Sequence, residues 1–281
     1  MHSTLVILAA GASSRMKQSD ATNSLSEEKI NAANSLSKAL IGVGSNNRPL
    51  LDFLLLHAKR AAYTDVILVV GAQASAFKKH YGNTFEGLQI SYATQSIPKE
   101  RIKPSGTADA VLQAMEQFPK LKNQAFTVCN ADNLYSVKAL EALRKNADIN
   151  AFISYDRDGL LFSMERISRF ALVQLDPDDF VSNFIEKPEP SEIKHYQDVH
   201  GTYRVSMNIF KFNGSLIYAY LQNCPLHQER DEKELPTAIL NMCKDNPKAM
   251  RGIPFKEHVP DLTSKEDIDK MGDYLDQNFS V

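Results

Sequence analysis

The chain has 281 residues, of which 43% are hydrophobic and 23% are charged, and these fractions are ordinary for a soluble globular protein. Its 32 basic and 34 acidic residues give a formal net charge of -2, so the protein has no overall electrostatic attraction to nucleic acid. No apolar run approaches the roughly 18 residues that a membrane span needs, and three scattered cysteines argue against a disulfide framework or a zinc site.

Strand-like apolar runs alternate with amphipathic helical patterns through the first half of the chain. In chain order the sequence predicts strand 5–9, helix 50–62, strand 65–71, helix 73–81, strand 88–93, helix 107–118, strand 125–133, helix 137–145 and strand 150–154. These strands are apolar throughout, which indicates burial on both faces. We therefore expect an α/β fold with a mainly parallel, Rossmann-like twisted sheet and helices on both of its faces.

The pattern changes in the second half, which is smaller and richer in strands. The sequence predicts strands 169–176, 180–188 and 201–212, helices 214–222 and 231–244, strand 250–255 and helix 265–275. We interpret the whole chain, residues 1–281, as one domain with halves of about residues 1–155 and 156–281. The polar segment 18–37 has no convincing apolar stripe, so we predict a mobile insertion or a lid there.

The first predicted strand ends in the loop GASSRMK, residues 11–17. A glycine-containing loop after a parallel strand is where open α/β sheets bind ligands. The loop matches neither the P-loop pattern GxxxxGK[ST] nor GxGxxG. Gly11 would let a phosphate approach the backbone, and Ser13, Ser14 and Arg15 would donate hydrogen bonds. On residue chemistry alone, an ordinary polar turn is an equally simple interpretation.

The other candidate positions are also weak when each is taken alone. Asp132 follows an apolar strand, where a lone acid is more often a turn or helix-cap residue. PSGTADA, which contains Gly106 and Thr107, is a good turn and helix start in any protein. The exposed pair Glu186 and Lys187 before a proline is common by chance.

Taken in order, these motifs resemble the sugar-nucleotide pyrophosphorylases, a family of sugar-phosphate nucleotidyltransferases with a glycosyltransferase-A-like fold. The motifs are LAAGASSRMK with SKAL, VCNADN, YATQSIPKERIKPSGTADAV, FIEKPEP and SMNIFKF. The resemblance covers roughly residues 5–271. The chain departs from the family pattern at Ser13, where the family has a second glycine, at Ser37, where it has proline, and at Phe170 and Ala171, where it usually has Tyr-Gly.

The resemblance implies a nucleotide-diphospho-sugar transferase fold and an enzyme that couples a nucleoside triphosphate to a sugar 1-phosphate, with release of pyrophosphate. The first half would bind the nucleotide, and the smaller β-rich half would bind the sugar phosphate. The nucleotide-binding residues implied are Ala9, Ala10, Gly11, Gln95, Gly106 and Thr107, with Gln95 on a pyrimidine edge. The sugar-phosphate-binding residues implied are Glu186, Lys187 and Asn208.

The resemblance also implies the groups that handle phosphate charge. The catalytic residues would be Arg15 and Lys38 on the triphosphate, Lys187 on the incoming sugar phosphate, and Asp132 as a ligand of Mg²⁺. Asp261 is our choice for the second magnesium ligand. Asp267 is its rival, although TSKED also has the pattern of a helix start.

Two other activities are open at this stage. One is a cytidylyltransferase that acts on a non-sugar phosphate such as phosphocholine, and the other is a catalytically silent regulatory subunit that binds a nucleotide sugar. The motif around Glu186 and Lys187 and the strand of Asn208 favour a sugar phosphate. Arg15, Lys38 and Asp132 argue against a silent subunit, which needs no ligands for metal and triphosphate.

Location and partners follow from the composition. The run LVILAAGA, residues 5–12, is too short for a signal-peptide core and has no basic segment before it. Scattered cysteines fit a reducing compartment, so we expect a cytoplasmic protein. We expect a nucleoside triphosphate and a sugar 1-phosphate as partners, neither nucleic acid nor a membrane, and the sequence leaves homo-oligomer formation open.

Overall fold

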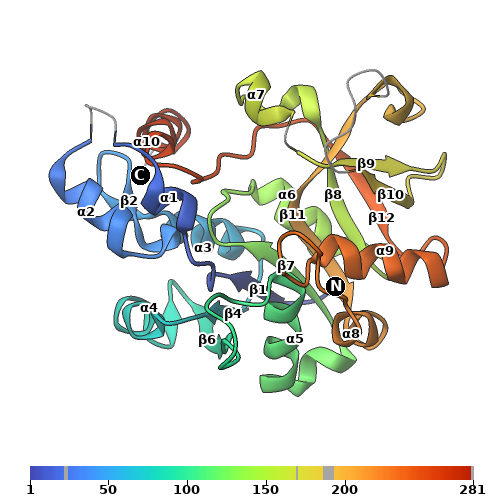
Figure 1. Cartoon of the computed structure of the whole chain (residues 1–281), viewed down its shortest axis with the longest axis horizontal. Helices are drawn as coiled ribbons and strands as arrows, with labels where there is room; N and C mark the ends of the chain where they lie inside the picture. Colours follow the sequence, from blue (N-terminus) through green and yellow to red (C-terminus); the bar gives the residue numbers. More distant parts are fainter. Residues whose placement is uncertain (22–24, 169, 186–192, 280–281) are drawn as a thin grey trace.

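The computed structural model describes residues 1–21, 25–168, 170–185 and 193–279, and the architecture below refers to these residues (Figure 1). Within these residues, a ten-stranded sheet runs through both halves of the chain in the order β10 (Val181–Ile185), β9 (Leu172–Leu175), β11 (Arg204–Asn213), β7 (Ala125–Asn130), β1 (Thr4–Leu8), β4 (Asp65–Val70), β6 (Leu88–Thr94) and β5 (Thr84–Phe85). Off this path, β8 (Ala151–Asp156) pairs with β11, and β12 (Arg251–Phe255) pairs with β8. Within the described ranges, no helix is long and apolar enough to cross a bilayer.

The centre of the sheet is parallel. It is formed by β7 (Ala125–Asn130), β1 (Thr4–Leu8), β4 (Asp65–Val70) and β6 (Leu88–Thr94), in this order, and the short edge strand β5 (Thr84–Phe85) is antiparallel to β6. Neighbouring parallel strands end on the same side of a sheet, so the loops that follow β1 and β7 are brought together.

The second half extends the sheet with mixed pairing. The long strand β11 (Arg204–Asn213) is antiparallel to β7, β8 (Ala151–Asp156) and β9 (Leu172–Leu175). β10 (Val181–Ile185) pairs antiparallel with β9, and β12 (Arg251–Phe255) pairs parallel with β8. β2 (Gly42–Val43) and β3 (Arg48–Pro49) form a separate two-stranded ribbon.

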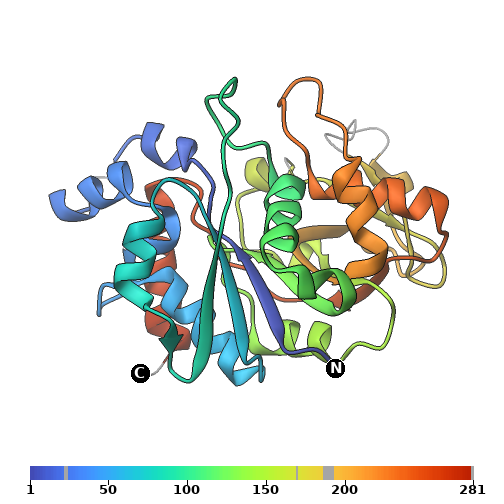
Figure 2. The ribbon, with the colours of Figure 1, turned by 90° about the horizontal axis from the view of Figure 1, so that it is seen from below.

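Helices cover both faces of the sheet (Figure 2). They are α1 (Ser14–Gln18), α2 (Glu27–Ser35), α3 (Leu50–Arg60), α4 (Ala74–Tyr81), α5 (Thr107–Gln117), α6 (Val137–Lys145), α7 (Met164–Ile167), α8 (Gly214–Gln222), α9 (Leu235–Asp245) and α10 (Glu266–Asn278). The side chains of β1 alternate between two cores. Leu5 and Ile7 pack with α3, α6 and α10, whereas Val6 packs with α5, α8 and α9. The predicted α/β fold with helices on both faces is confirmed.

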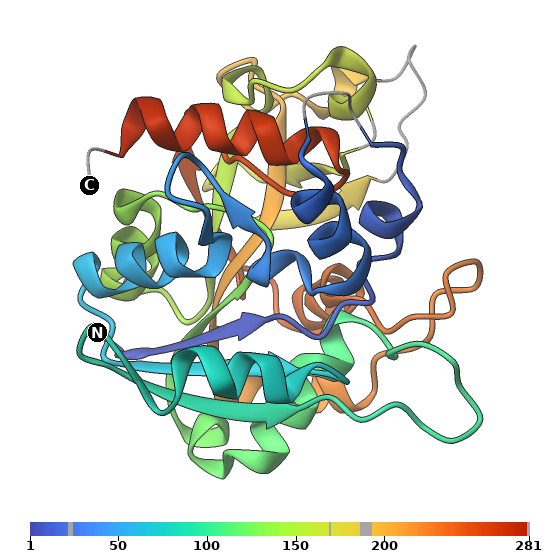
Figure 3. The ribbon, with the colours of Figure 1, turned by 90° about the vertical axis from the view of Figure 1, so that its left-hand side faces the viewer.

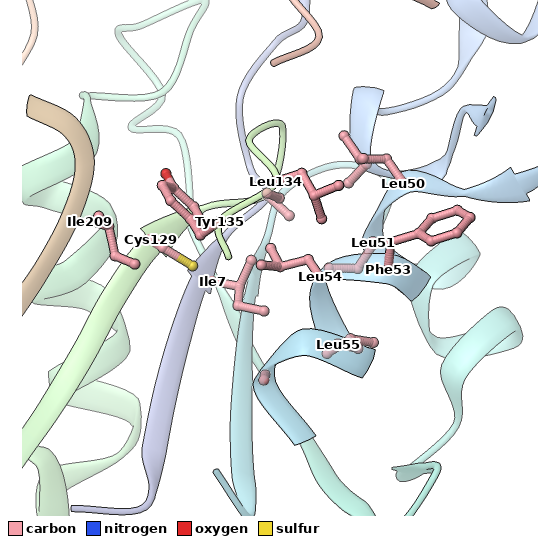
Figure 4. Packing of buried hydrophobic residues seen from close by; sticks show 14 of the residues in the cluster. Ile7, Leu50, Leu51, Phe53, Leu54, Leu55, Cys129, Leu134, Tyr135 and Ile209 are labelled. Atoms are coloured by element: carbon pink, nitrogen blue, oxygen red, sulfur yellow. The ribbon is translucent and has the colours of Figure 1, made fainter. Parts of the chain in front are cut away.

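Figure 4 shows part of the first core, where Ile7 and Cys129 of the sheet face the leucines of α3. These side chains are fully buried. A run that is apolar on every residue, such as Leu5, Val6 and Ile7, needs a covered surface on each side of the strand. The two cores supply these surfaces, which explains the absence of polar alternation in the predicted strands.

The structure differs from the predicted elements in several places, and two of the differences concern helices α9 and α2. Helix α9 begins at Leu235 and not at residue 231, because Pro236 lies in its first turn, where a proline favours a helix start. Within the segment 18–37, helix α2 forms after Ser26, whose hydroxyl accepts a hydrogen bond from the N–H of Lys29 at 3.3 Å. The sequence pattern did not predict this helix, and the mobility of the segment stays a prediction.

Candidate active site

The loops that follow β1 and β7 lie side by side at the carboxyl end of the sheet. Leu8 is in register with Asn130, and the N–H of Ala131 donates to the carbonyl of Leu8 at 3.1 Å. The N–H of Ala9 donates to Val69 of β4 at 2.8 Å, so the loop after β1 is anchored on both sides. Figure 3 shows these parallel strands running toward the end of the molecule where α1 and the loop before α5 lie.

The opening loop presents exposed backbone. Gly11 is exposed, and a Cβ built on it would meet no atom within 4 Å. Ser13 has φ 57° and ψ 29°, in the left-handed region that favours glycine. This conformation explains why the family that the sequence resembles has glycine at this position.

Helix α1 carries a cationic side chain, Arg15, at the same end of the sheet. Met16 is buried and anchors the helix, whereas Arg15 is exposed. Among the described residues, Arg15 has no ion-pair partner, so its charge is available to an anionic ligand.

Lys38 and Asp132 form an ion pair in the centre of the candidate site. Lys38 Nζ lies 3.0 Å from Asp132 Oδ2, and Lys38 is only 8% exposed. Its backbone N–H donates to Ser13 Oγ at 3.4 Å, which ties it to the opening loop. Gln73 Oε1 accepts a hydrogen bond from the N–H of Ser37 at 2.5 Å and thereby holds the backbone just before Lys38 in place. The structure thus brings together the predicted cation and the predicted metal ligand.

The segment that carries Asp261 pairs with the Asp132 loop. Asn133 and Asp261 form an antiparallel bridge, and the N–H of Leu262 donates to the carbonyl of Asp132 at 2.9 Å. A second bond, from the N–H of Leu134 to the carbonyl of Pro260, also measures 2.9 Å. Asp132 and Asp261 therefore lie on adjacent, hydrogen-bonded backbone segments.

Asp267 has a structural role that Asp261 lacks. Asp267 Oδ2 accepts from the backbone N–H groups of Thr263 and Ser264 at 2.8 and 2.7 Å, which orders the turn into α10. Its other oxygen pairs with Arg166 Nη1 at 2.6 Å, and its side chain is 5% exposed against 14% for Asp261. Both oxygens of Asp267 are thus occupied, which makes Asp261 the better candidate for the predicted second metal ligand.

The donor set fits magnesium. Mg²⁺ prefers oxygen ligands and is commonly held by one or two carboxylates, with water and substrate phosphate completing its shell. Asp132 and Asp261 offer two carboxylates. In the part of the chain that the structure describes, no group of three or more His, Cys, Asp or Glu could hold a metal ion. Phosphate and water would therefore have to supply the remaining ligands.

The predicted base-binding residues pack against the loop before α9. Gln95 is 5% exposed, and its Nε2 donates to the carbonyl of Gly106 at 3.0 Å and to Asp109 at 2.8 Å. Gly106 has φ 107°, and a Cβ there would lie 2.4 Å from the carbonyl oxygen of Lys233. Thr107 Oγ1 accepts from the N–H of Leu235 at 3.0 Å. Both donor hydrogens of the Gln95 amide are thus engaged within the protein.

The predicted sugar-side residues are only partly described. Glu186 and Lys187 lie outside the described residues. Asn208 has φ 56° and sits where the pairing of β11 with β8 shifts register, a bulge conformation that asparagine tolerates. Met207 and Ile209 on either side of it are buried, as strand alternation predicts.

Tyr135 links the end of β7 to β11, and no sequence motif singled it out. Its hydroxyl donates to the carbonyl of Met207 at 2.7 Å and accepts from the N–H of Asn130 at 3.4 Å. Burial raises the pKa of Tyr135 well above its usual value, so the hydroxyl stays protonated. The only sequence signal was a tyrosine three residues after Asp132.

Arg166 is the second residue that the sequence analysis missed. It belongs to the short helix α7 and reaches both Asp261 and Asp267. Its neighbour His258 packs against Phe162 with ring centroids 4.8 Å apart. Burial and the positive charge of Arg166 lower the pKa of His258 to about 4, so its ring is neutral at pH 7.

Comparison with known proteins adds sequence and structural relatives. A sequence model of a family described as nucleotidyl transferase matches residues 31–256. Glucose-1-phosphate adenylyltransferase of Corynebacterium jeikeium is 24% identical over 162 residues, covering 56% of this chain and 39% of the relative. D-glycero-alpha-D-manno-heptose 1-phosphate guanylyltransferase of Campylobacter jejuni is 29% identical over 142 residues, covering 50% and 56%. The chain thus spans 39% of the length of the first of these curated relatives and 56% of the length of the second.

Solved structures show a similar fold over nearly the whole chain. A UDP-glucose pyrophosphorylase complexed with UDP-glucose superposes with a TM-score of 0.72 at 14% identity, covering 99% of this chain and 100% of that one. A putative glucose-1-phosphate thymidylyltransferase from Bacillus anthracis gives 0.69 at 17% identity, with 99% and 96% covered. At these identities, the likeness concerns the fold.

Proposed function

Because the chain belongs to the nucleotidyl transferase family, we propose that it couples a nucleoside triphosphate to a sugar 1-phosphate and releases pyrophosphate. The observation that carries this proposal is the pair of Lys38 and Asp132, 3.0 Å apart, beside the exposed backbone of Gly11 at the carboxyl end of the sheet. The names of the two curated relatives, which are nucleotidyltransferases that act on sugar 1-phosphates, support the same class of reaction.

The reaction needs positioning and charge neutralisation more than proton transfer. The attacking oxygen of a sugar phosphate is already an anion, so no general base is required, and the chain has to align it with the α-phosphate. In this proposal Arg15 and Lys38 bind the triphosphate and stabilise the charge that develops on the leaving pyrophosphate. Lys187 binds the incoming sugar phosphate.

The proposal includes magnesium as cofactor. Asp132 and Asp261 would hold it, and the bound ion would neutralise charge on the phosphate oxygens. Asp132 would then hold the metal in place of its contact with Lys38, and the ammonium of Lys38 would be available to the phosphates. Tyr135 holds the Asp132 loop and the Asn208 bulge in a fixed relation, so the nucleotide and the sugar meet in one orientation.

The two alternatives are less well supported. The names of the two curated relatives mention sugar 1-phosphates and no other phosphate acceptor. A silent regulatory subunit would have no use for a buried Lys38 paired with Asp132. Those names include both adenylyl and guanylyl transfer, so the nucleobase has to be identified by measuring activity with each nucleoside triphosphate.

The test is a measurement of pyrophosphate release with Mg²⁺ over a grid of five nucleoside triphosphates and several sugar 1-phosphates, with phosphocholine as a further acceptor. We expect one strong combination with a sugar 1-phosphate, and its loss in Asp132→Asn. Turnover of phosphocholine alone would support the cytidylyltransferase alternative. Nucleotide binding without any turnover would support the silent subunit.

A further inference from the structure

Arg166 stands at the edge of the proposed metal site, and no motif of the sequence points to it. Helix α7 starts after Ser163, whose hydroxyl accepts from the N–H of Arg166 at 3.3 Å. The guanidinium lies 4.4 Å from the ring centroid of Phe162. Its side chain is 21% exposed, so it is largely held within the protein.

The two terminal nitrogens of Arg166 have different surroundings. Nη1 lies 2.6 Å from Asp267 Oδ1, and Asp267 is itself fixed by the turn before α10. Nη2 lies against Asp261 Oδ1 as an ion pair. Nη2 is nevertheless buried without a well-directed hydrogen bond to any described residue. Asp267 and Phe162 therefore anchor the guanidinium, and the contact with Asp261 is the exchangeable one.

Each of the two carboxylates proposed to hold magnesium thus faces a cation of the chain itself. Lys38 lies on Asp132, and Arg166 lies on Asp261. A guanidinium and a divalent cation at one carboxylate repel each other, and in a partly buried site this repulsion is only weakly screened.

We propose that Arg166 is the internal counter-ion of Asp261 and competes with the divalent cation for this carboxylate. When the cation binds, Nη2 leaves Asp261, while Nη1 remains on Asp267. Arg166 thereby lowers the affinity of the empty enzyme for metal and makes Asp261 available mainly when phosphate brings the metal. This inference rests on the proposed function, because it takes Asp132 and Asp261 as the metal ligands.

The test measures binding of Mn²⁺ to the full chain without nucleotide, by electron paramagnetic resonance of the free ion. We expect Arg166→Met to bind Mn²⁺ about tenfold more tightly than the wild type, because one nearby positive charge is lost. Arg166→Gln is a second variant in case the first does not fold, and Arg166→Lys, which keeps the charge, should retain most of the weak binding.

Arg48 provides a matched control. It also pairs with an aspartate, Asp52, at 3.0 Å and lies 5.8 Å from the ring centroid of a phenylalanine, Phe53. Arg48→Met should lower stability without changing Mn²⁺ affinity. The double variant Arg166→Met with Asp261→Asn should lose the gain in affinity, which would assign that gain to Asp261.

Several results overturn the inference. Unchanged or weaker Mn²⁺ binding in both Arg166→Met and Arg166→Gln would mean that Arg166 orients Asp261 for the metal or plays no part. A gain that persists after Asp261→Asn would place the competition elsewhere. The proposed function fails by a different result, an empty pyrophosphate-release grid for the wild type, and that result leaves the Mn²⁺ comparison interpretable.

Discussion

Two residues of the opening loop show how single positions prepare the site. Gly11 leaves open space beside the backbone, and Ser13 holds a left-handed conformation that most residues avoid. Together they turn the chain from β1 into α1 within a few residues. Arg15 on this short helix is then exposed at the carboxyl end of the sheet, and Ser13 itself accepts a hydrogen bond from the N–H of Lys38 at 3.4 Å.

Arg15→Ala is expected to lower turnover by about 10² or more, because it removes one preorganised charge from the developing pyrophosphate. Steady-state kinetics with the best substrate pair would measure this. Arg60→Ala, an exposed arginine at the end of α3, is the matched control and should leave turnover unchanged. Wild-type turnover in Arg15→Ala would refute the role of this residue.

At the scale of elements, the loop before α5 and the loop before α9 act as one unit. Both project from the same end of the molecule (Figures 2 and 3). Arg101 pairs with Asp231 at 2.9 Å, Lys103 pairs with Glu232 at 3.0 Å, and the N–H of Lys233 donates to Ser105 at 2.6 Å. Helix α5, which starts beside the predicted base-binding residues, is therefore braced by a segment about 130 residues further along the chain.

Gly106→Ala should destabilise this unit. The residue has φ 107°, and the added Cβ would lie 2.4 Å from the carbonyl oxygen of Lys233. We expect a loss of about 1 kcal/mol from the backbone conformation plus roughly 1–3 kcal/mol from the clash. Gly201→Ala is the control, because Gly201 also has a positive φ, 75°, but its Cβ would meet no atom within 4 Å. Equal losses of unfolding free energy in urea would contradict the proposed brace.

The segment 18–37 is a second unit at this scale. Its helix α2 buries only Ala33 among its own residues, so packing contributes little to holding it in place. We expect nucleotide with Mg²⁺ to slow tryptic cleavage at Lys29, while cleavage at the remote, exposed Lys248 stays unchanged. Cleavage at Lys29 that is equally fast with and without ligand would count against closure over the nucleotide.

At the scale of the whole molecule, one sheet carries both proposed substrate sides. The parallel strands β1 and β7 end at the proposed nucleotide side, and β11, which pairs with β7, carries Asn208, a proposed contact of the sugar. Since both sides are built on the same hydrogen-bonded sheet, their relative position is fixed by strand register. A rigid arrangement of this kind suits a reaction that depends on alignment.

Two half-buried histidines are expected to make the stability of the fold depend on pH. Burial, reinforced by Lys211, lowers the pKa of His2 to about 4, and burial with Arg166 nearby does the same for His258. The unfolded chain binds these protons near pH 6.5 and the folded chain does not, so stability is full above pH 6.5 and falls as the pH drops toward 4. We expect a loss on the order of 1–3 kcal/mol between pH 7 and pH 5.

Urea unfolding at several pH values measures this dependence. His2→Gln should flatten the slope between pH 7 and pH 5, whereas His200→Gln, at an exposed position, should leave it unchanged. An identical slope in His2→Gln and the wild type would mean that His2 does not contribute.

The sequence by itself determined most of the long elements and their kind. Apolar runs and helical spacing are local signals, and strands such as β1 and β4 and helices such as α3 and α6 lie where those signals predict. The ordered motifs also indicated the family, which the match to residues 31–256 confirms. The helix α2 was missed because its stability derives from a cap and not from an apolar stripe.

Only the tertiary structure decided which side chains meet. The pairs Lys38 with Asp132 and Arg166 with Asp261 each join residues more than 90 positions apart. Such pairs depend on strand register and on the paths of loops, which local periodicity of the sequence does not reveal. The same is true of Tyr135, whose hydroxyl bonds to a distant strand. The resemblance of the ordered motifs therefore singled out the carboxylates as candidates, and three-dimensional packing assigned them their partners.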